Sequence, residues 1–137
     1  MSTTNAVAKV MEYKKKNEQH YSSLIHELNM ENKKAIEAIE SNELNRFKSH
    51  FENSRALTKR LGELAGVGIE NDSQSELIEQ TKKNGAFVAK LPGAGGGDSI
   101  IAICLGKSNA KNVQAFWKRQ GLNVLDVNIT NDGVKVR

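Results

Sequence analysis

Cysteine and proline are almost missing from this chain of 137 residues, which contains one of each. A single cysteine, Cys104, excludes a framework of disulfides within the chain. Cys104 lies inside the apolar stretch IIAICL, where a thiol packs as a small apolar group, whereas a catalytic thiol needs a positively charged and partly exposed setting. The sequence therefore predicts a structural role for Cys104.

Long apolar runs are missing as well. No run approaches the ~20 apolar residues that cross a bilayer, and residues 1–20 contain no apolar signal core and no small-residue cleavage site. The hydrophobic content of 38% excludes global disorder. We therefore expect a soluble, cytoplasmic protein, and the length of the chain predicts one domain over residues 1–137.

The sequence has neither clustered metal ligands nor an unbroken positive stretch longer than three residues. His20 and His26 are six residues apart, off a shared helix face, and His50 stands beside Phe51, so we predict no metal site. The net charge of +4 comes from basic residues that are mixed with acids, and only YKKK forms a block. Such mixing is typical of solvated helix faces, so we predict no nucleic-acid partner and no membrane association.

The first part of the chain has the periodicity of helices. The Ser and Thr residues at positions 2–4 can cap a short first helix. Apolar residues at three- and four-residue steps predict a long amphipathic helix from about residue 18 and another from about residue 42. In DSQSELIEQTKKNG, Ser73 and Glu76 match an S-x-x-E capping box, which predicts a compact helix.

The pattern changes after this helix. The stretches AFVAKL, residues 86–91, and SIIAICL, residues 99–105, are short and rich in β-branched residues, which predicts two strands. Residues 109–121 return to a helical pattern. LNVLDVNI, residues 122–129, and VKVR, residues 134–137, predict two more strands around the turn TNDG. Helices beside a small, mostly antiparallel sheet indicate an α+β two-layer sandwich.

The stretch KLPGAGGGDSIIAI, residues 90–103, places one proline and four glycines within six positions. The dinucleotide fingerprint would need glycine in place of Asp98 and a helix afterwards, and a P-loop ending in GKS would need glycine in place of Ile101. Both motifs are excluded. Successive amides of such a turn can form a concave nest for an anionic oxygen, with phosphate as the best candidate. A plain hairpin turn is the alternative, although it needs only one or two glycines.

Two charged residues accompany this loop. The carboxylate of Asp98 repels a phosphate unless a metal, a lysine or backbone donors intervene, and its alternative role is to cap the turn. Lys90 can supply positive charge, although an exposed strand lysine is equally consistent with the sequence.

From ENSRALTKR to GGGDSIIAI, about residues 50–105, the chain resembles the C-terminal domain of the GHMP kinases, the galacto-, homoserine, mevalonate and phosphomevalonate kinases. The resemblance rests on a helix, an LGV-like turn, a second helix and AKLPGAGGGD before an apolar strand. Asp98 after three glycines, together with STTNAV at the start, is most similar to bacterial phosphomevalonate kinases. Pro92 and Ser99 stand where the family commonly has Ser or Thr and Cys.

The resemblance implies ATP-dependent phosphorylation of phosphomevalonate to diphosphomevalonate in isoprenoid synthesis, with ATP and Mg²⁺ in the full-length enzyme. The family's N-terminal nucleotide-binding domain has no counterpart here. The resemblance therefore implies that phosphomevalonate and ATP bind together with that domain, that the chain alone is inactive and holds no cofactor tightly, and that the uncovered interface allows self-association.

The same resemblance implies which residues form the site. Ser2, Thr3 and Lys90 are further candidates for substrate contact, and no catalytic residue or metal ligand is expected. The phosphate- and substrate-binding loop would consist of Gly93, Ala94, Gly95, Gly96, Gly97 and Asp98.

Two other interpretations stay open. The chain can belong to another GHMP kinase, a mevalonate or homoserine kinase. It can also be a stand-alone anion-binding or regulatory module, which would bind its ligand without a partner domain.

Overall fold

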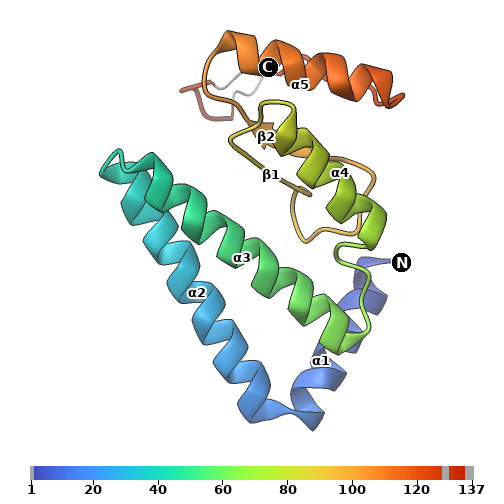
Figure 1. Ribbon diagram of the computed structural model, residues 1–137. Coiled ribbons are helices and arrows are strands. Elements are labelled where there is room, and N and C mark those ends of the chain that lie inside the picture. The colour runs from blue at the N-terminus through green and yellow to red at the C-terminus, as the bar shows by residue number, and fades with distance from the viewer. Residues whose placement is uncertain (1, 128–129, 135–137) are drawn as a thin grey trace.

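The computed structural model describes residues 2–127 and 130–134. In these residues the helices α1 to α4 are followed by strands β1 and β2, which form one antiparallel sheet, and by helix α5. Helices α2 and α3 run side by side as an antiparallel pair, and α4, the sheet and α5 lie above α3 in Figure 1. The predicted α+β class with a small antiparallel sheet is confirmed.

The first three helices follow the predicted periodicity. Helix α1 spans Thr3–Lys16 and is capped by Ser2, whose hydroxyl accepts a backbone N–H three residues further on. Helix α2 spans Glu18–Glu40 and helix α3 spans Leu44–Ala65. Gly66 caps the C-terminal end of α3 in the left-handed conformation, which glycine tolerates best. Ala38 of α2 and Phe47 of α3 are buried in one cluster, and Ala35 and Phe51 pack against it, which joins these two helices.

Helix α4 spans Asp72–Lys83, and its capping box differs from the predicted one. The predicted pair, Ser73 and Glu76, is wrong. The cap is Asn71, whose side chain accepts the N–H of Gln74, while the side chain of Gln74 accepts the N–H of Asn71. Because the helix begins two residues earlier than the Ser73 pattern requires, Gln74 occupies the third helical position.

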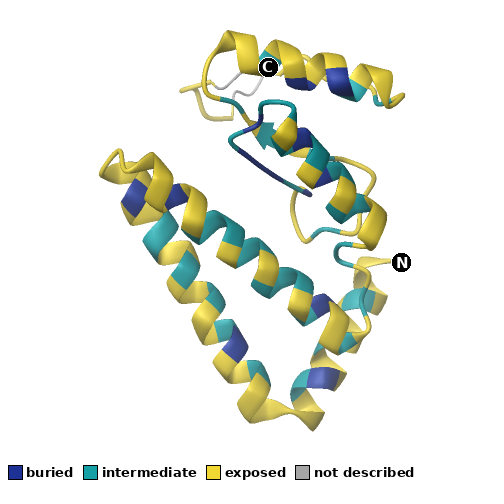
Figure 2. Ribbon diagram, in the orientation of Figure 1, coloured by how far each residue is buried: buried dark blue, intermediate teal, exposed yellow. Residues whose placement is uncertain are grey.

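The sheet lies between two groups of helices. Strand β1, Val88–Lys90, pairs with strand β2, Ile101–Ile103, so that Val88 lies opposite Ile103. Val88 packs against α2 and α3 through Ala38 and Phe47. The next residue, Ala89, points to the other face and packs against Ile78 of α4. The two clusters hold β1 in the centre of the fold, and Figure 2 shows this strand as buried.

Helix α5 spans Lys107–Arg119 and follows the sheet. Within the described residues 122–127 and 130–134 no strand forms, so the prediction of strands in LNVLDVNI and VKVR is wrong for the part that can be compared. The other residues of these stretches, 128–129 and 135–137, lie outside the described residues. Alternating apolar residues make a strand only beside a free sheet edge, and here Leu125 and Val127 remain about three-quarters exposed.

Candidate functional site

The glycine loop, residues 92–98, connects the two strands. Gly93, Gly95 and Gly96 have positive φ angles of 59°, 81° and 70°. These angles lie in the left-handed region, which residues with a Cβ adopt only at a cost in conformational free energy. Gly97 does not have a positive φ. The backbone therefore requires glycine at three of the four glycine positions of the loop.

The loop lies directly on the connector between α3 and α4, residues 66–70. The N–H of Gly96 donates to the carbonyl of Ile69 over 2.6 Å. A Cβ added to Gly95 would lie 2.5 Å from the Ile69 oxygen, and one added to Gly96 would lie 2.6 Å from the Gly68 oxygen. Both distances are too short for a side chain, so Gly95 and Gly96 allow two backbone segments to touch.

A side chain of α4 also holds the loop. The amide nitrogen Nε2 of Gln74 donates to the carbonyl of Gly97 over 2.8 Å. The other end of the same amide, Oε1, accepts the N–H of Asn71. Gln74 therefore joins the start of α4 to the glycine loop.

Only part of the loop's backbone is free to bind a ligand. The N–H of Gly95 donates to the carbonyl of Pro92, and that of Gly96 is taken by the connector. The other backbone N–H groups of residues 93–98 have no hydrogen-bond acceptor within the described residues. These free donors are the N–H groups of Gly93, Ala94, Gly97 and Asp98.

The carboxylate of Asp98 does not cap the loop within the part of the chain that the structure describes. Its one hydrogen bond there is from the hydroxyl of Ser99, over 3.5 Å. The side chain of Asp98 is exposed. The capping role considered for Asp98 is therefore not observed, and the carboxylate is left at the outer end of the loop.

A cavity of about 140 Å³ lies beside the loop, between α2, α3 and the end of β1. Gly93 and Ala94 line it, and so do Arg55, Lys59 and Lys90. Arg55 and Lys59 form ion pairs, whereas Lys90 has no acidic partner within 4 Å among the described residues. The structure thus brings Lys90 and the first half of the glycine loop together around a cavity that is also lined by Glu70, the ion-pair partner of Arg55.

The first residues of the chain reach the other side of the loop. Thr3 lines an apolar groove of about 390 Å³ together with Gly95 and Gly96. Ser2 is used as the cap of α1. Of these two candidates for substrate contact, Thr3 is the one that the structure places in a groove with the loop.

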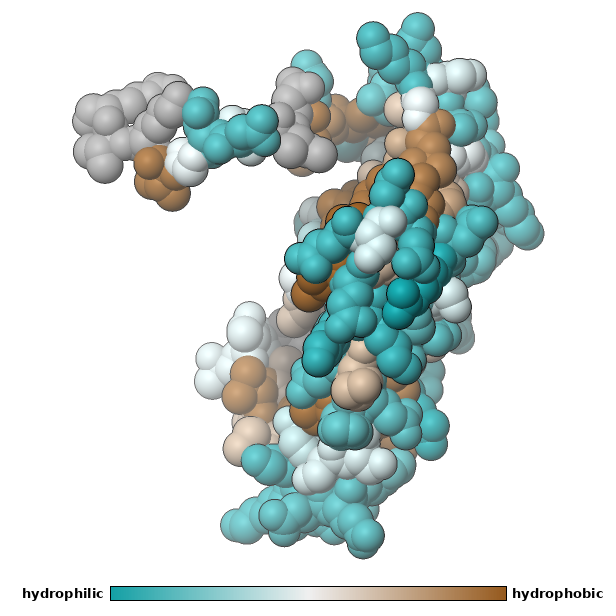
Figure 3. Space-filling view, turned by 90° about the vertical axis from the view of Figure 1, so that its left-hand side faces the viewer, coloured by the Kyte–Doolittle hydropathy of each residue, from teal (hydrophilic) through white to brown (hydrophobic). Residues whose placement is uncertain are grey.

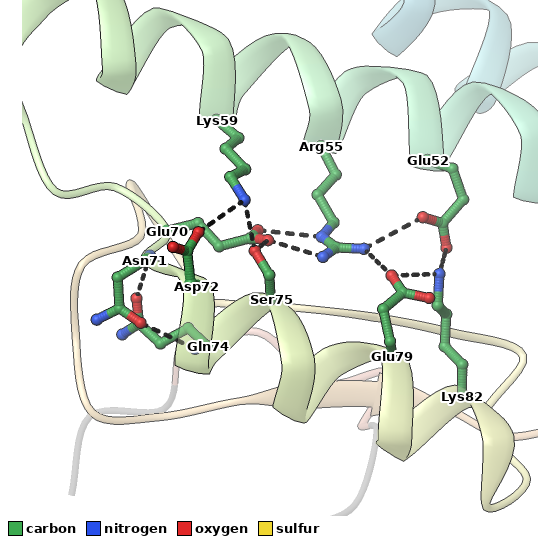
Figure 4. A network of polar contacts seen from close by, with 10 residues as sticks. All are labelled: Glu52, Arg55, Lys59, Glu70, Asn71, Asp72, Gln74, Ser75, Glu79 and Lys82. Carbon is green, nitrogen blue, oxygen red and sulfur yellow. Dashed lines mark hydrogen bonds and ion pairs between the residues drawn. The ribbon is translucent and has the colours of Figure 1, made fainter.

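An ion-pair network fastens the connector beneath the loop, as Figure 4 shows. Arg55 of α3 binds Glu70 through two bonds, from Nε over 3.0 Å and from Nη2 over 2.7 Å. Ser75 donates to the same carboxylate, and Lys59 donates to Ser75. The side chains of Arg55 and Glu70 are 12% and 5% exposed, so this pair is largely shielded from water.

The pair is charged at neutral pH. Burial raises the pKa of Glu70, but the hydrogen bonds from Arg55 and Ser75 outweigh burial and bring the pKa below its ordinary value. Burial lowers the pKa of Arg55, and its bonds to Glu70 and Glu79 reverse this and raise the pKa. Sequence reasoning missed this network, because residues 15 positions apart on different elements leave no periodic signal.

Two of the three histidines form hydrogen bonds with other side chains. The imidazole of His50 on α3 lies 2.7 Å from Glu31 on α2, and His20 lies 2.8 Å from the hydroxyl of Tyr13. In residues 2–127 and 130–134, no group of three or more His, Cys, Asp or Glu could hold a metal ion. Burial raises the pKa of the Cys104 thiol, which disfavours the reactive thiolate.

None of the helices in the described ranges combines the length and the apolar character that crossing a membrane requires.

Comparison with known families adds a match over most of the chain. The model of the family described as GHMP kinases C terminal matches residues 35–123. This range includes α3, α4, the sheet, the glycine loop and α5.

Two curated relatives are phosphomevalonate kinases. The phosphomevalonate kinase of Saccharolobus solfataricus is 32% identical over 126 residues, which cover 91% of this chain and 38% of that protein. The peroxisomal phosphomevalonate kinase of Arabidopsis thaliana is 43% identical over 72 residues, which cover 52% of this chain and 14% of that protein. The chain thus spans well under half the length of the curated relatives it matches.

One solved structure is similar over nearly the whole chain. The crystal structure of the Lin0012 protein from Listeria innocua superimposes with a TM-score of 0.81 at 27% sequence identity. The match covers 92% of this chain and 35% of that one. The arrangement of helices around the small sheet is therefore shared with a protein whose structure was determined by crystallography.

Proposed function

This chain belongs to the family of GHMP kinase C-terminal domains, and on that premise we propose that it is the C-terminal domain of a phosphomevalonate kinase. Residues 1–137 form this domain, and the nucleotide-binding domain is a separate, N-terminal part of the whole kinase. The whole kinase transfers the γ-phosphoryl group of ATP to the phosphate of phosphomevalonate, which gives diphosphomevalonate and ADP in isoprenoid synthesis.

The observation that carries this proposal is the set of free backbone donors beside Lys90. Phosphoryl transfer needs little covalent chemistry from the protein and depends on positioning and on neutralising negative charge. Gly93 and Ala94 line the cavity together with Lys90, whereas Gly97 and Asp98 lie at the other end of the loop. We propose that these groups bind phosphate oxygens of the substrate.

The remaining residues have smaller parts in the proposal. Gly95 and Gly96 shape the loop through their contact with the connector. The hydrogen bonds to the phosphate come from the residues on either side of them. Thr3 lies in the adjoining groove, where it can contact the apolar part of the substrate, and Ser2 holds the start of α1. No general base is assigned to this chain.

Mg²⁺ does not fit the described residues of this chain. Among them no cluster of carboxylates or imidazoles could hold a metal, and Asp98 stands alone on the loop. We propose that a metal used by the whole kinase is held by the nucleotide and the N-terminal domain, and that this chain alone does not bind ATP tightly. The kinase is proposed to be cytoplasmic, and the uncovered surface of this domain is proposed to allow self-association.

A chimera tests the proposal. In the kinase of Saccharolobus solfataricus, the segment that matches this chain would be replaced by residues 1–137. We expect ATP-dependent phosphorylation of phosphomevalonate by the chimera and no turnover by the chain alone. The measurement is production of ADP with phosphomevalonate, mevalonate or homoserine as the acceptor.

The acceptors distinguish the alternatives. A folded chimera that prefers mevalonate or homoserine would assign the chain to another GHMP kinase. Tight binding of ATP by the isolated chain, measured by calorimetry, would favour a stand-alone module instead.

A further inference from the structure

Gln74 makes two different hydrogen bonds with the two ends of one side-chain amide. Its Oε1 accepts the N–H of Asn71 over 2.9 Å, which completes the capping box of α4. Its Nε2 donates to the carbonyl of Gly97 over 2.8 Å, across 23 positions of sequence. The first bond stabilises the N-terminal end of α4. The second bond is not part of the cap, because it joins α4 to the glycine loop.

The second bond fixes the direction of a whole peptide group. The carbonyl of Gly97 and the N–H of Asp98 belong to one planar peptide, and no described peptide bond is cis. In a trans peptide these two groups point in opposite directions. Because Gln74 holds the carbonyl toward α4, the N–H of Asp98 must point away from α4, and it has no acceptor within the described residues.

The position also lacks other constraints. Gly97 has no positive φ, and a Cβ built on it would meet nothing within 4 Å. Gly95 and Gly96 are held by the connector, but Gly97 is not among the residues that touch it. Without Gln74, the peptide between Gly97 and Asp98 could turn over, and a carbonyl oxygen would then face an incoming anion.

We propose that Gln74 is a positioning residue of the phosphate site, which acts by turning the N–H of Asp98 toward the ligand. The inference rests on the proposed function of the loop. It explains how the loop tolerates Asp98 in an anion site: the backbone donor of Asp98 faces the anion in a fixed orientation, while the exposed carboxylate is free to point to solvent.

Two substitutions of Gln74 separate its roles. Gln74→Glu keeps an oxygen that accepts the N–H of Asn71 but loses the donor to Gly97. Gln74→Met loses both bonds and adds no charge. Both variants lose the bond to Gly97 and keep the bond from the backbone N–H of residue 74 to the Asn71 side chain. We expect Gln74→Met to unfold about 2–5 °C lower than Gln74→Glu, because only Gln74→Met loses the side-chain acceptor for the N–H of Asn71.

Both variants should bind phosphate more weakly. The probe is inorganic phosphate, titrated into the ¹⁵N-labelled 137-residue chain while the backbone amide signals of Gly97 and Asp98 are followed by NMR. We expect the dissociation constant to rise about tenfold in both variants, as for the loss of one well-directed hydrogen bond to a charged group. Weaker binding by the neutral Gln74→Met variant shows that the effect is not repulsion by a new carboxylate.

Gln80→Glu is the matched control. It makes the same chemical change on the same helix, at a half-buried side chain that makes no hydrogen bond with the loop. We expect its phosphate binding and its Gly97 and Asp98 signals to equal those of the unchanged chain. A similar loss of binding in Gln80→Glu would overturn the proposal, since charge or helix damage would then be the cause.

The titration also separates this inference from the function of the loop. If phosphate shifts no loop signal in the unchanged chain, the proposed anion site fails. The positioning role can be tested even in that case. Without ligand, both Gln74 variants must shift the amide signals of Gly97 and Asp98 relative to the unchanged chain. Unmoved signals in the unliganded variants, or phosphate binding equal to that of the unchanged chain, would overturn it.

Discussion

Different physical reasons account for the glycine at each of the four glycine positions of the loop. Gly95 and Gly96 touch the backbone of the connector, where any side chain would collide with a carbonyl oxygen. Gly93 has a positive φ but open space around it. Gly97 has neither a positive φ nor a close neighbour. The fold therefore explains three of these glycines, and for Gly97 we propose close approach of a ligand as the reason.

Substitution of Gly97 tests this reading. We expect Gly97→Ala to keep or slightly raise the free energy of unfolding, by about 0.5 kcal/mol, because alanine restricts the unfolded chain. Binding of phosphate should nevertheless weaken, since the new methyl group stands where the ligand approaches. Denaturant unfolding and the NMR titration with phosphate measure the two effects.

Gly95→Ala is the contrasting variant. Its methyl group would meet the Ile69 oxygen at 2.5 Å, at a φ of 81°. We expect it to lose about 2 kcal/mol of unfolding free energy or more. Equal stability of the two variants would contradict the distinction drawn between these glycines.

The sequence revealed the excess of glycine but not its division between two roles. The partners of Gly95 and Gly96 lie about 27 positions earlier, in a connector whose path depends on how α3 and α4 pack. The role of Gln74 was hidden for the same reason. Its bond to Gly97 joins residues that become neighbours only in the folded chain.

At the scale of elements, the joint between α3 and α4 depends on a shielded ion pair. Arg55 and Glu70 satisfy each other through two hydrogen bonds, and Glu79 and Lys82 extend the network along α4. Replacing one partner of a shielded pair leaves the other charge without compensation, which costs more than the pair contributes.

We therefore expect Arg55→Met to lower the free energy of unfolding by about 3 kcal/mol, since it leaves the Glu70 carboxylate buried and unpaired. Arg46→Met is the control, because Arg46 is 44% exposed and pairs with exposed glutamates. Its cost should stay below about 1 kcal/mol. Urea denaturation of both variants measures the difference, and equal costs would show that the Arg55 pair is no stronger than a surface contact.

Local patterns predicted the helices better than the strands. Helices α1 to α5 satisfy their backbone within each segment, so periodicity and caps along the sequence are sufficient to find them. The capping box of α4 was placed two residues late because Ser73 imitates the cap that Asn71 provides. A strand needs a partner as well as a pattern, and in the described part of LNVLDVNI the pattern has no partner.

At the scale of the whole molecule, apolar surface remains uncovered. On one side of the molecule, apolar patches reach the surface in Figure 3. Val7 and Met11 of α1 are more than half exposed, and both line the apolar groove beside the loop. Ile101 and Ile103 of the sheet are nearly half exposed. Exposed apolar groups that line a groove, as Val7 and Met11 do, are typical of surfaces that bind another protein.

This surface predicts association of the isolated chain with itself. We expect the mass measured by sedimentation equilibrium to rise with concentration, and the double substitution Val7→Ser and Met11→Ser to weaken association about tenfold or more, because it removes apolar area from α1. Ala8→Ser, at an exposed position of the same helix, should have no effect. A mass of one chain at every concentration would contradict this prediction.

The sequence predicted the fold class and the family more fully than it predicted the shape of the site. The α+β class follows from the order of periodic segments, and the resemblance to GHMP kinases follows from AKLPGAGGGD in its context. The placement of Lys90 by the loop depends on the register between β1 and β2, which puts Lys90 opposite Ile101. No local pattern contains that register.

The glycine loop contacts the connector between α3 and α4 through Ile69. This contact couples ligand binding by the loop to the stability of the connector, which forms the joint between α3 and α4. A phosphate group that prefers the loop in its ordered shape must strengthen the joint by the same free energy with which an intact joint strengthens binding. Arg55, which is ion-paired in the joint, would then influence the dissociation constant of a ligand held by the loop's free amides. The affinity of the loop would in that case be a property of the connection between two helices as well as of the glycines themselves.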